Sequence, residues 1–103
     1  MIDNEEILKL GGNIELSGFK SLNGGQMIIL KKIIGNYARS FADKSENFEL
    51  LSVNMKTVHE RETSELFEIH AKLIDNGKHT TSQITDRNIF VAVDTVLKKL
   101  EVQ

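Results

Sequence analysis

The chain of 103 residues contains no cysteine, no proline and no tryptophan. Without cysteine it can form neither a disulfide nor a thiolate metal site, and its three histidines are too few and too scattered to suggest zinc. We therefore expect no metal and no cofactor. No apolar run approaches the ~20 residues that span a bilayer, and the acidic start, residues 1–6, is unlike a signal peptide. These absences predict a cytoplasmic protein with no membrane partner.

What remains is the composition of one small domain, with 40% hydrophobic residues. A chain of this length removes roughly two-thirds of its unfolded surface from water, which is enough for a single core without covalent staples. We assign residues 13–103 to this domain. Residues 1–12 lack a clear pattern and are expected to form an extension, which either frays or docks as a short amphipathic piece on an edge.

Charge is nearly balanced overall, at a formal net −2, but it is not evenly distributed. Residues 1–19 hold one lysine against four acids, residues 20–45 hold five cations against one acid, and residues 46–75 hold three cations against seven acids. The net charge argues against a strongly basic, generic nucleic-acid binder. If the basic and acidic segments form different faces, the molecule is electrically polar.

The first half of the domain predicts a strand and a helix. Apolar and polar residues alternate from Asn13 to Phe19, which is typical of a short strand. From about Gln26 to Phe41 apolar residues recur at intervals of three and four, which indicates a helix with one buried stripe. Asn23 is the expected cap, although two glycines follow it.

The second half predicts three strands and a final helix. Alternation over 51–56 and 67–73 indicates two half-buried strands joined by a polar loop at 59–63. Asn76-Gly77 suits a tight hairpin turn, so residues 78–84 should return as an edge-like strand. Helical spacing of apolar residues then runs to Leu100, with Thr85 or Asp86 as the expected cap.

The element order is β-α-β-β-β-α. It predicts an α+β fold in the form of a two-layer sandwich, in which a four-stranded, mostly antiparallel sheet has both helices on one face. The first helix must act as a crossover between the first strand and the three-strand meander, and a right-handed crossover is the default.

The residues offer little for catalysis. Glu68, His70 and Lys72 alternate along one strand face and could form an acid-base line, but alternation alone places solvated polar residues there. Gly24-Gly25 before a helix suggests at most one backbone contact to a phosphate, because the lysine and hydroxyl residue of a P-loop are missing. We expect no enzymatic activity and no small-molecule substrate.

The final segment, Asp86 to Glu101, resembles the last helix of the ribosome hibernation-promoting factors, also called ribosome-associated inhibitor A or protein Y. In that family the helix opens with an acidic residue, an aromatic and alanine, and closes on a Leu-x-Lys-Leu-like sequence. The resemblance covers about residues 13–102. Further matching positions are Gly18-Phe19, Lys31-Lys32 with Tyr37, Val53 with Lys56, and Phe67 to Leu73.

The resemblance implies a non-enzymatic factor that occupies the decoding region of the small ribosomal subunit, where transfer and messenger RNA bind, and holds the ribosome inactive. Its partners would be the small subunit and its ribosomal RNA, contacted through cations on and around the two helices. The matching positions in this sequence are Lys31, Lys32, Arg39, Lys56, Arg87, Lys98 and Lys99. A rigid cationic helix face can bind structured RNA through phosphates and shape, without base-specific contacts.

Each of these residues also has a purely structural interpretation. The paired lysines can form the solvated sides of amphipathic helices. Arg87 can reach Asp94 or Glu101, and Arg39 can pair with Asp43 at a spacing of four. The aromatic rings of Tyr37 and Phe90 could stack on bases, but helical spacing favours core positions for both.

The chain also departs from the family pattern. The family is commonly basic, so this slightly acidic chain should bind RNA more weakly or with more salt sensitivity. Because the sequence stops at Gln103, we expect a short form that lacks the C-terminal dimerisation domain of long members. The alternative function is a protein-interaction module that docks a partner through the sheet edge or an acidic sheet face.

Overall fold

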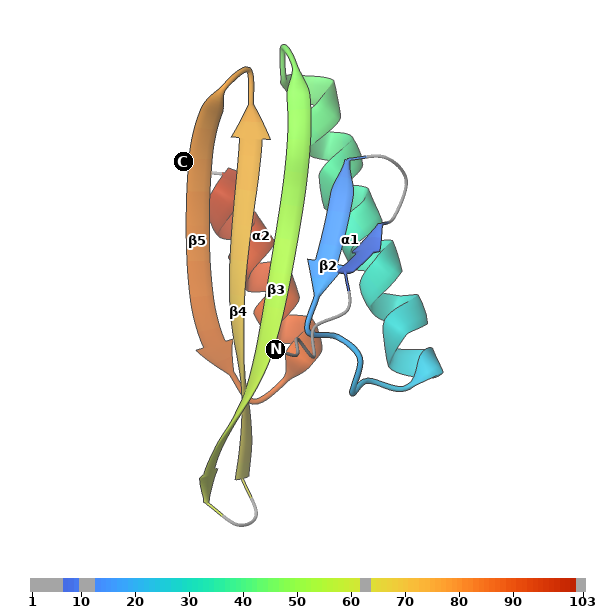
Figure 1. Cartoon of the computed structure of the whole chain (residues 1–103), viewed down its shortest axis with the longest axis vertical. Helices are drawn as coiled ribbons and strands as arrows, with labels where there is room; N and C mark the ends of the chain where they lie inside the picture. The colour runs from blue at the N-terminus through green and yellow to red at the C-terminus, as the bar shows by residue number, and fades with distance from the viewer. Residues whose placement is uncertain (1–6, 10–12, 62–63, 102–103) are drawn as a thin grey trace.

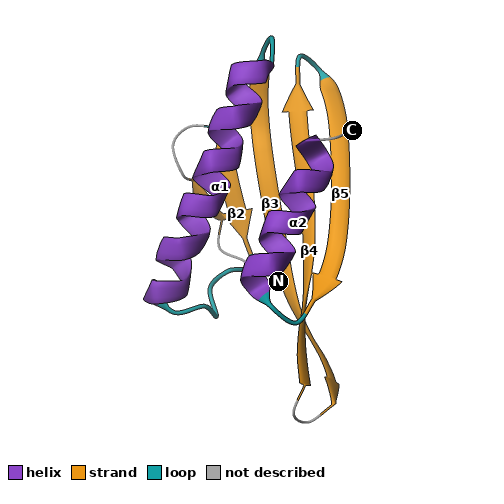
Figure 2. Cartoon of the chain, turned by 180° about the vertical axis from the view of Figure 1, so that it is seen from behind, coloured by secondary structure: helices purple, strands orange, loops and turns teal. Residues whose placement is uncertain are grey.

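The computed structural model describes residues 7–9, 13–61 and 64–101, and it is an α+β fold with two helices on one face of a mixed sheet (Figures 1 and 2). The predicted order β-α-β-β-β-α is confirmed for residues 14–101, and a short additional strand precedes it. The elements are β1 (Ile7–Lys9), β2 (Ile14–Ser17), α1 (Gly24–Lys44), β3 (Phe48–Arg61), β4 (Ser64–Asp75), β5 (Lys78–Asp86) and α2 (Ile89–Glu101).

The strands lie in the order β1-β2-β3-β4-β5. Among the described strands only β2 and β3 are parallel, from Ile14 opposite Leu51 onward, so the sheet is mostly antiparallel as predicted. The four predicted strands are β2 to β5. The fifth, β1, comes from the N-terminal extension and pairs antiparallel with β2, so this part of the extension docks on an edge. Residues 1–6 and 10–12 lie outside the described residues.

Helix α1 begins where the sequence predicts. The side chain of Asn23 accepts a hydrogen bond from the backbone N–H of Gln26 at 2.8 Å, and the Gln26 side chain accepts from the N–H of Asn23 at 3.0 Å. This reciprocal capping box satisfies two donors of the first turn and offsets the poor helix propensity of the two glycines that follow Asn23. The helix buries Leu30, Ile34, Ala38 and Phe41.

Helix α2 is capped by Asn88, which is not one of the two predicted caps. The Asn88 side chain accepts from the N–H groups of Phe90 and Val91, at 2.9 and 3.1 Å. The prediction of Thr85 or Asp86 as the cap was wrong, because β5 continues to Asp86. The Asp86 carboxylate instead accepts from the N–H of Asn88 at 2.9 Å and thereby shapes the loop between strand and helix.

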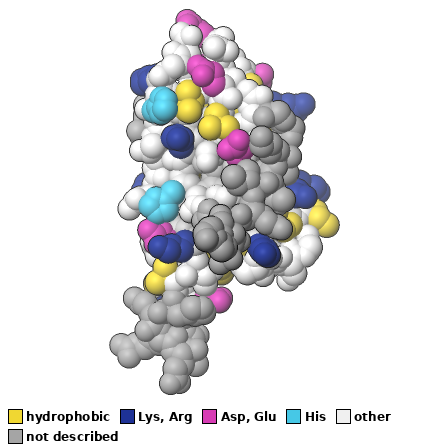
Figure 3. Space-filling model, in the orientation of Figure 1, with side chains coloured by type: hydrophobic (Ala, Val, Ile, Leu, Met, Phe, Trp, Pro, Cys, Tyr) yellow, Lys and Arg dark blue, Asp and Glu magenta, His cyan; other side chains and the backbone are white. Residues whose placement is uncertain are grey.

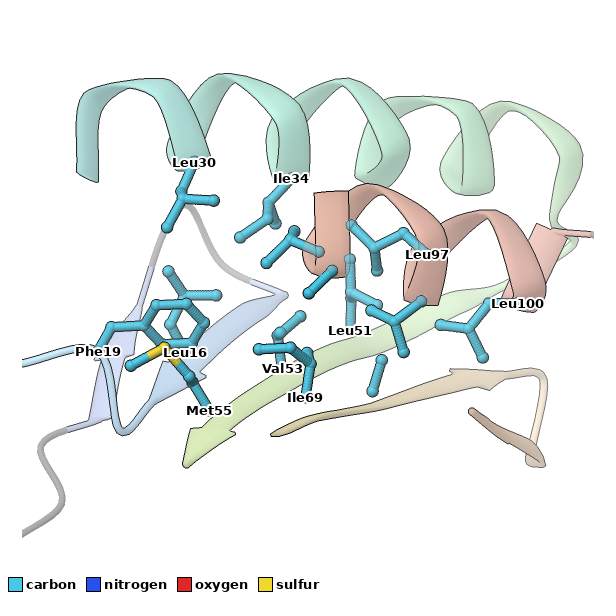
Figure 4. Packing of buried hydrophobic residues seen from close by; sticks show 14 of the residues in the cluster. Leu16, Phe19, Leu30, Ile34, Leu51, Val53, Met55, Ile69, Leu97 and Leu100 are labelled. Atoms are coloured by element: carbon cyan, nitrogen blue, oxygen red, sulfur yellow. The ribbon is translucent and has the colours of Figure 1, made fainter. Parts of the chain in front are cut away.

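The core lies between the two helices and the sheet (Figure 4). Leu16 of β2, Leu51 and Val53 of β3, Ile69 of β4 and Leu97 of α2 are fully buried. The alternation along β3 therefore directs its apolar residues toward the helices and its polar residues toward the opposite, open face. No polar or charged side chain is buried among the described residues.

Gly18 allows β2 to end tightly against β3. Its φ is +83°, and a Cβ atom built on it would lie 2.0 Å from the carbonyl oxygen of Met55. Any other residue would meet that backbone oxygen in a conformation that L-amino acids rarely adopt. The close approach directs the chain so that the next residue, Phe19, is buried in the core.

The β3–β4 hairpin is longer than predicted. The predicted strands end near Lys56 and Phe67, with a loop at 59–63, but pairing continues to Arg61 opposite Ser64. Beyond the last partners of β2 and β5, at Asn54 and Phe67, the hairpin continues as a two-stranded arm that projects from the body (Figure 1). A two-stranded ribbon that packs on no core does not require alternating apolar residues, so its sequence lacks the pattern that predicts a strand.

The β4–β5 turn agrees with the prediction. Asn76 and Gly77 have φ values of +53° and +83°, as a two-residue hairpin turn of this kind requires. Strand β5 then forms the far edge of the sheet.

Candidate nucleic-acid interface

The predicted cations of α1 lie on its solvent side. Lys31, Lys32 and Arg39 are all exposed, whereas the buried stripe of this helix faces the sheet. Lys32 and Arg39 are seven residues apart, so their side chains leave the helix in nearly the same direction. These two residues present positive charge along the outer surface of α1.

The cations of α2 do not share one environment. Lys98 is exposed, and Arg87 is exposed immediately before the Asn88 cap. Lys99, by contrast, donates a hydrogen bond from Nζ to the backbone oxygen of Gln83 on β5, at 3.1 Å. Its ammonium group is therefore tied to the sheet edge, while Lys98 points to solvent.

Lys56 lies on the other side of the molecule. Its neighbours Val53 and Met55 are buried beneath the helices, so alternation places Lys56 on the open face of the sheet, opposite Glu68 of β4. The structure therefore does not bring Lys56 together with the cations of α1 and α2.

A line of hydrogen bonds joins the facing sides of the two helices. The Tyr37 hydroxyl donates to Asp94 at 2.9 Å, and the Ser40 hydroxyl donates to Glu101 at 3.1 Å. The Lys44 ammonium lies 3.5 Å from the same Glu101 carboxylate. Both carboxylates of α2 that face α1 are thus bound within the protein.

Tyr37 is a structural residue in this line. Burial of its ring, the hydrogen bond to Asp94 and the negative charges of Asp94 and Glu101 raise its pKa to about 12. Its ring packs against the core and lies 6.2 Å from that of Phe41. The prediction that Tyr37 and Phe90 pack against the core, rather than project to stack on bases, agrees with their partial burial.

The structural alternatives for the two arginines are not found. Among the described side chains, those of residues 13–58 and 65–101, the ion pairs are Lys44 with Glu101 and His70 with Glu68. Arg39 does not pair with Asp43, and Arg87 reaches neither carboxylate of α2 in this part of the chain. Both guanidinium groups remain accessible to a ligand.

The open face of the sheet carries polar side chains of both signs (Figure 3). Glu68 and His70 lie side by side as predicted, with 2.8 Å between the carboxylate and Nε2. A shallow hollow of about 520 Å³ lies next to them, lined mainly by polar residues of β3, β4 and β5. The charged side chains at the centre of the open face are two acids and two cations, Glu15, Glu68, Lys56 and Lys72. The described open face is therefore not the acidic surface that the alternative function requires.

Several exposed residues are not among the predicted site residues. Lys20, in the loop between β2 and α1, is exposed, and its signal was its place at the start of the basic segment. Ile28, Ile29 and Val91 are 60%, 47% and 47% exposed. Their exposure could have been predicted from the sequence, because they are apolar residues that fall outside the buried stripes of the two helices.

The described residues include no group of three or more side chains suited to holding a metal ion, and no described helix is long and apolar enough to cross a membrane. Comparison of the sequence with protein-family models found no matching family, and comparison with curated proteins found no match.

Proposed function

We propose that this chain is a non-enzymatic factor that binds the small ribosomal subunit through its ribosomal RNA and blocks the decoding region. The observation that carries the proposal is the division of charge on the helix side. The carboxylates of Asp94 and Glu101 are bound by side chains of α1, whereas Lys32, Arg39 and Lys98 are directed to solvent. Among the described side chains Lys32, Arg39 and Lys98 take part in no ion pair, so their charges are available to a phosphate backbone that approaches the helices.

The physical logic suits structured RNA. Such RNA is recognised largely through its phosphates and its shape, and rigid helices hold cations in fixed positions for this purpose. The hydrogen bonds between α1 and α2 fix the two helices relative to each other. Binding of this kind needs no catalytic group, and a bound domain would exclude other ligands from the same site by its volume alone.

The proposed surface consists of the exposed cations of the helix side, Lys31, Lys32, Arg39, Arg87 and Lys98. Lys99 is assigned to the β5 edge and Lys56 to the open face, so neither belongs to it. Acting on ribosomes, the protein would work in the cytoplasm.

The test is co-sedimentation of the purified protein with small ribosomal subunits across a salt series. The variant Lys32→Glu/Arg39→Glu reverses two charges on the helix side, and Lys56→Glu/Lys72→Glu makes the same change of net charge on the open face. We expect wild-type binding to fall with salt at about 0.7–0.9 log units per log unit of salt for each phosphate contact. The helix variant should bind at least about tenfold more weakly, and the open-face variant should bind like the wild type.

Two results would contradict the proposal. Equal losses in both variants would mean that net charge, rather than the helix surface, determines binding. Absence of wild-type binding even at low salt would remove the ribosomal partner altogether. If the wild type binds as expected, inhibition of translation by the same variants is the next measurement.

A further inference from the structure

Strand β5 is an edge strand whose outer backbone groups follow a simple rule. The two-residue turn at Asn76-Gly77 makes Asp75 and Lys78 a hydrogen-bonded pair, and the register from there to Asp86 contains no bulge. Even-numbered residues of β5 therefore bond to β4, and the N–H and C=O groups of odd-numbered residues point away from it. Strand β5 ends the described sheet (Figure 1). The outer backbone groups of its odd-numbered residues therefore face away from the sheet.

The sequence of β5 is complementary to itself. An antiparallel copy of the strand, centred so that Ser82 faces Ser82 of the second copy, pairs odd-numbered residues with odd-numbered residues through their outward groups. In this register Lys78 lies opposite Asp86 of the second copy at both ends of the ladder. No charged residue interrupts the strand between these ends, and no proline is present.

Lys99 lies across this edge. Its Nζ donates to the oxygen of Gln83, an odd-numbered residue whose carbonyl points away from β4. A lysine on an exposed edge is a common means of preventing strand addition. The bond at Gln83 therefore occupies a backbone acceptor that an added strand would need.

We propose that the β5 edge binds a second copy of this chain by antiparallel strand pairing about Ser82, and that Lys99 holds this edge closed in the monomer. The second copy is favoured over an unrelated peptide because the register matches lysine to aspartate at both ends. The β5 edge is separate from Lys31, Lys32 and Arg39 of the proposed RNA-binding surface, whereas Arg87 of that surface directly follows the end of β5.

Sedimentation velocity over a concentration series tests the proposal, with Lys99→Ala as the main variant and Lys98→Ala as its control. Both remove one charge from adjacent residues, but only Lys99→Ala releases Gln83. We expect Lys99→Ala to lower the dimer dissociation constant at least about tenfold relative to the wild type, and Lys98→Ala to leave it unchanged. Equal behaviour of wild type and Lys99→Ala up to the highest soluble concentration would overturn the proposal.

A second variant locates the interface. Gln83→Pro removes an N–H that points away from β4, so the β4–β5 ladder is kept while the outer ladder loses a donor. Lys99→Ala/Gln83→Pro should return to the monomer with an unchanged circular dichroism spectrum, and persistent dimers of this folded variant would place association elsewhere. If that variant does not fold, Lys78→Asp in the Lys99→Ala background decides. It sets a carboxylate opposite Asp86 of the second copy at both ends of the ladder, so the dimer should weaken, and an unchanged dissociation constant would refute the register.

Discussion

Alanine substitutions at three glycines, one at a time, separate the two reasons why position 18 requires glycine: its positive φ and its close approach to Met55. At Gly18 the added Cβ would lie 2.0 Å from the Met55 carbonyl oxygen, and φ is +83°. At Gly77 φ is also +83°, but nothing lies within 4 Å of the added atom. At Gly35, within α1, the space is open and the helix is the preferred conformation for alanine.

The expected free energies of unfolding follow from these differences. The left-handed conformation alone costs about 1–2 kcal/mol, so Gly77→Ala should destabilise by that amount. Gly18→Ala adds a clash with backbone that cannot rotate away, of about 1–3 kcal/mol, for a total of about 2–5 kcal/mol. Gly35→Ala should instead stabilise the protein by up to about 1 kcal/mol. Domains of this size have only about 5–15 kcal/mol of stability, so the first effect is large.

Urea unfolding followed by far-ultraviolet circular dichroism measures all three variants against the wild type. The order Gly35→Ala, wild type, Gly77→Ala, Gly18→Ala, from most to least stable, is expected. The reasoning fails if Gly18→Ala costs no more than Gly77→Ala, because the close approach to Met55 would then contribute nothing.

Two further predictions concern the helices. Tyr37 is the only tyrosine and there is no tryptophan, so phenolate absorbance reports on this one residue. It should titrate near pH 12 in the folded protein and near 10.0 in denaturant. Because the folded pKa is the higher one, the stability that the neutral phenol contributes is complete below pH 10.0 and is lost as pH rises toward 12. Midpoints that coincide would contradict the burial of the Tyr37 ring and its bond to Asp94. Tyr37→Phe should cost about 1 kcal/mol. Asn88→Ala should lower the free energy of unfolding by about 1 kcal/mol, in thermal or urea unfolding, because the α2 cap is lost. Asn88→Asp retains an acceptor and should be nearly neutral. Equal stability of the two variants would show that the cap is unimportant.

The fold was predictable because one-sided burial imposes a period on every element that touches the core. The stripe of α1 and the alternation of β3 both carry this signal, and the Asn-Gly turn is a local one. The arm carried no such signal, because no layer backs it. The cap of α2 was misplaced because Thr85, Asp86 and Asn88 are all acceptable caps, and only the length of β5 decides among them.

The sequence predicted which cations are exposed, but not how all of them are arranged relative to one another. Alternation already placed Lys56 opposite the buried residues of β3, so its separation from the helix cations could have been recognised before the structure was known. The bond from Lys99 to Gln83 could not, since it depends on how α2 crosses β5. Likewise, Asp94 and Glu101 looked like partners for Arg87 along one helix, yet their partners come from α1.

The parallel pairing of β2 with β3 has a consequence for the order of folding. Strands β3, β4 and β5 meet through short turns, but β2 reaches β3 only across α1, as in the bond from Asn54 to Ser17 between residues 37 positions apart. Closing that long loop costs chain entropy before its contacts form, so β2 should join the meander late. Gly18 lies at the end of β2, in the part of the structure that is expected to form late. Its replacement should therefore accelerate unfolding more than it slows folding, and the variant would be short-lived rather than slow to form.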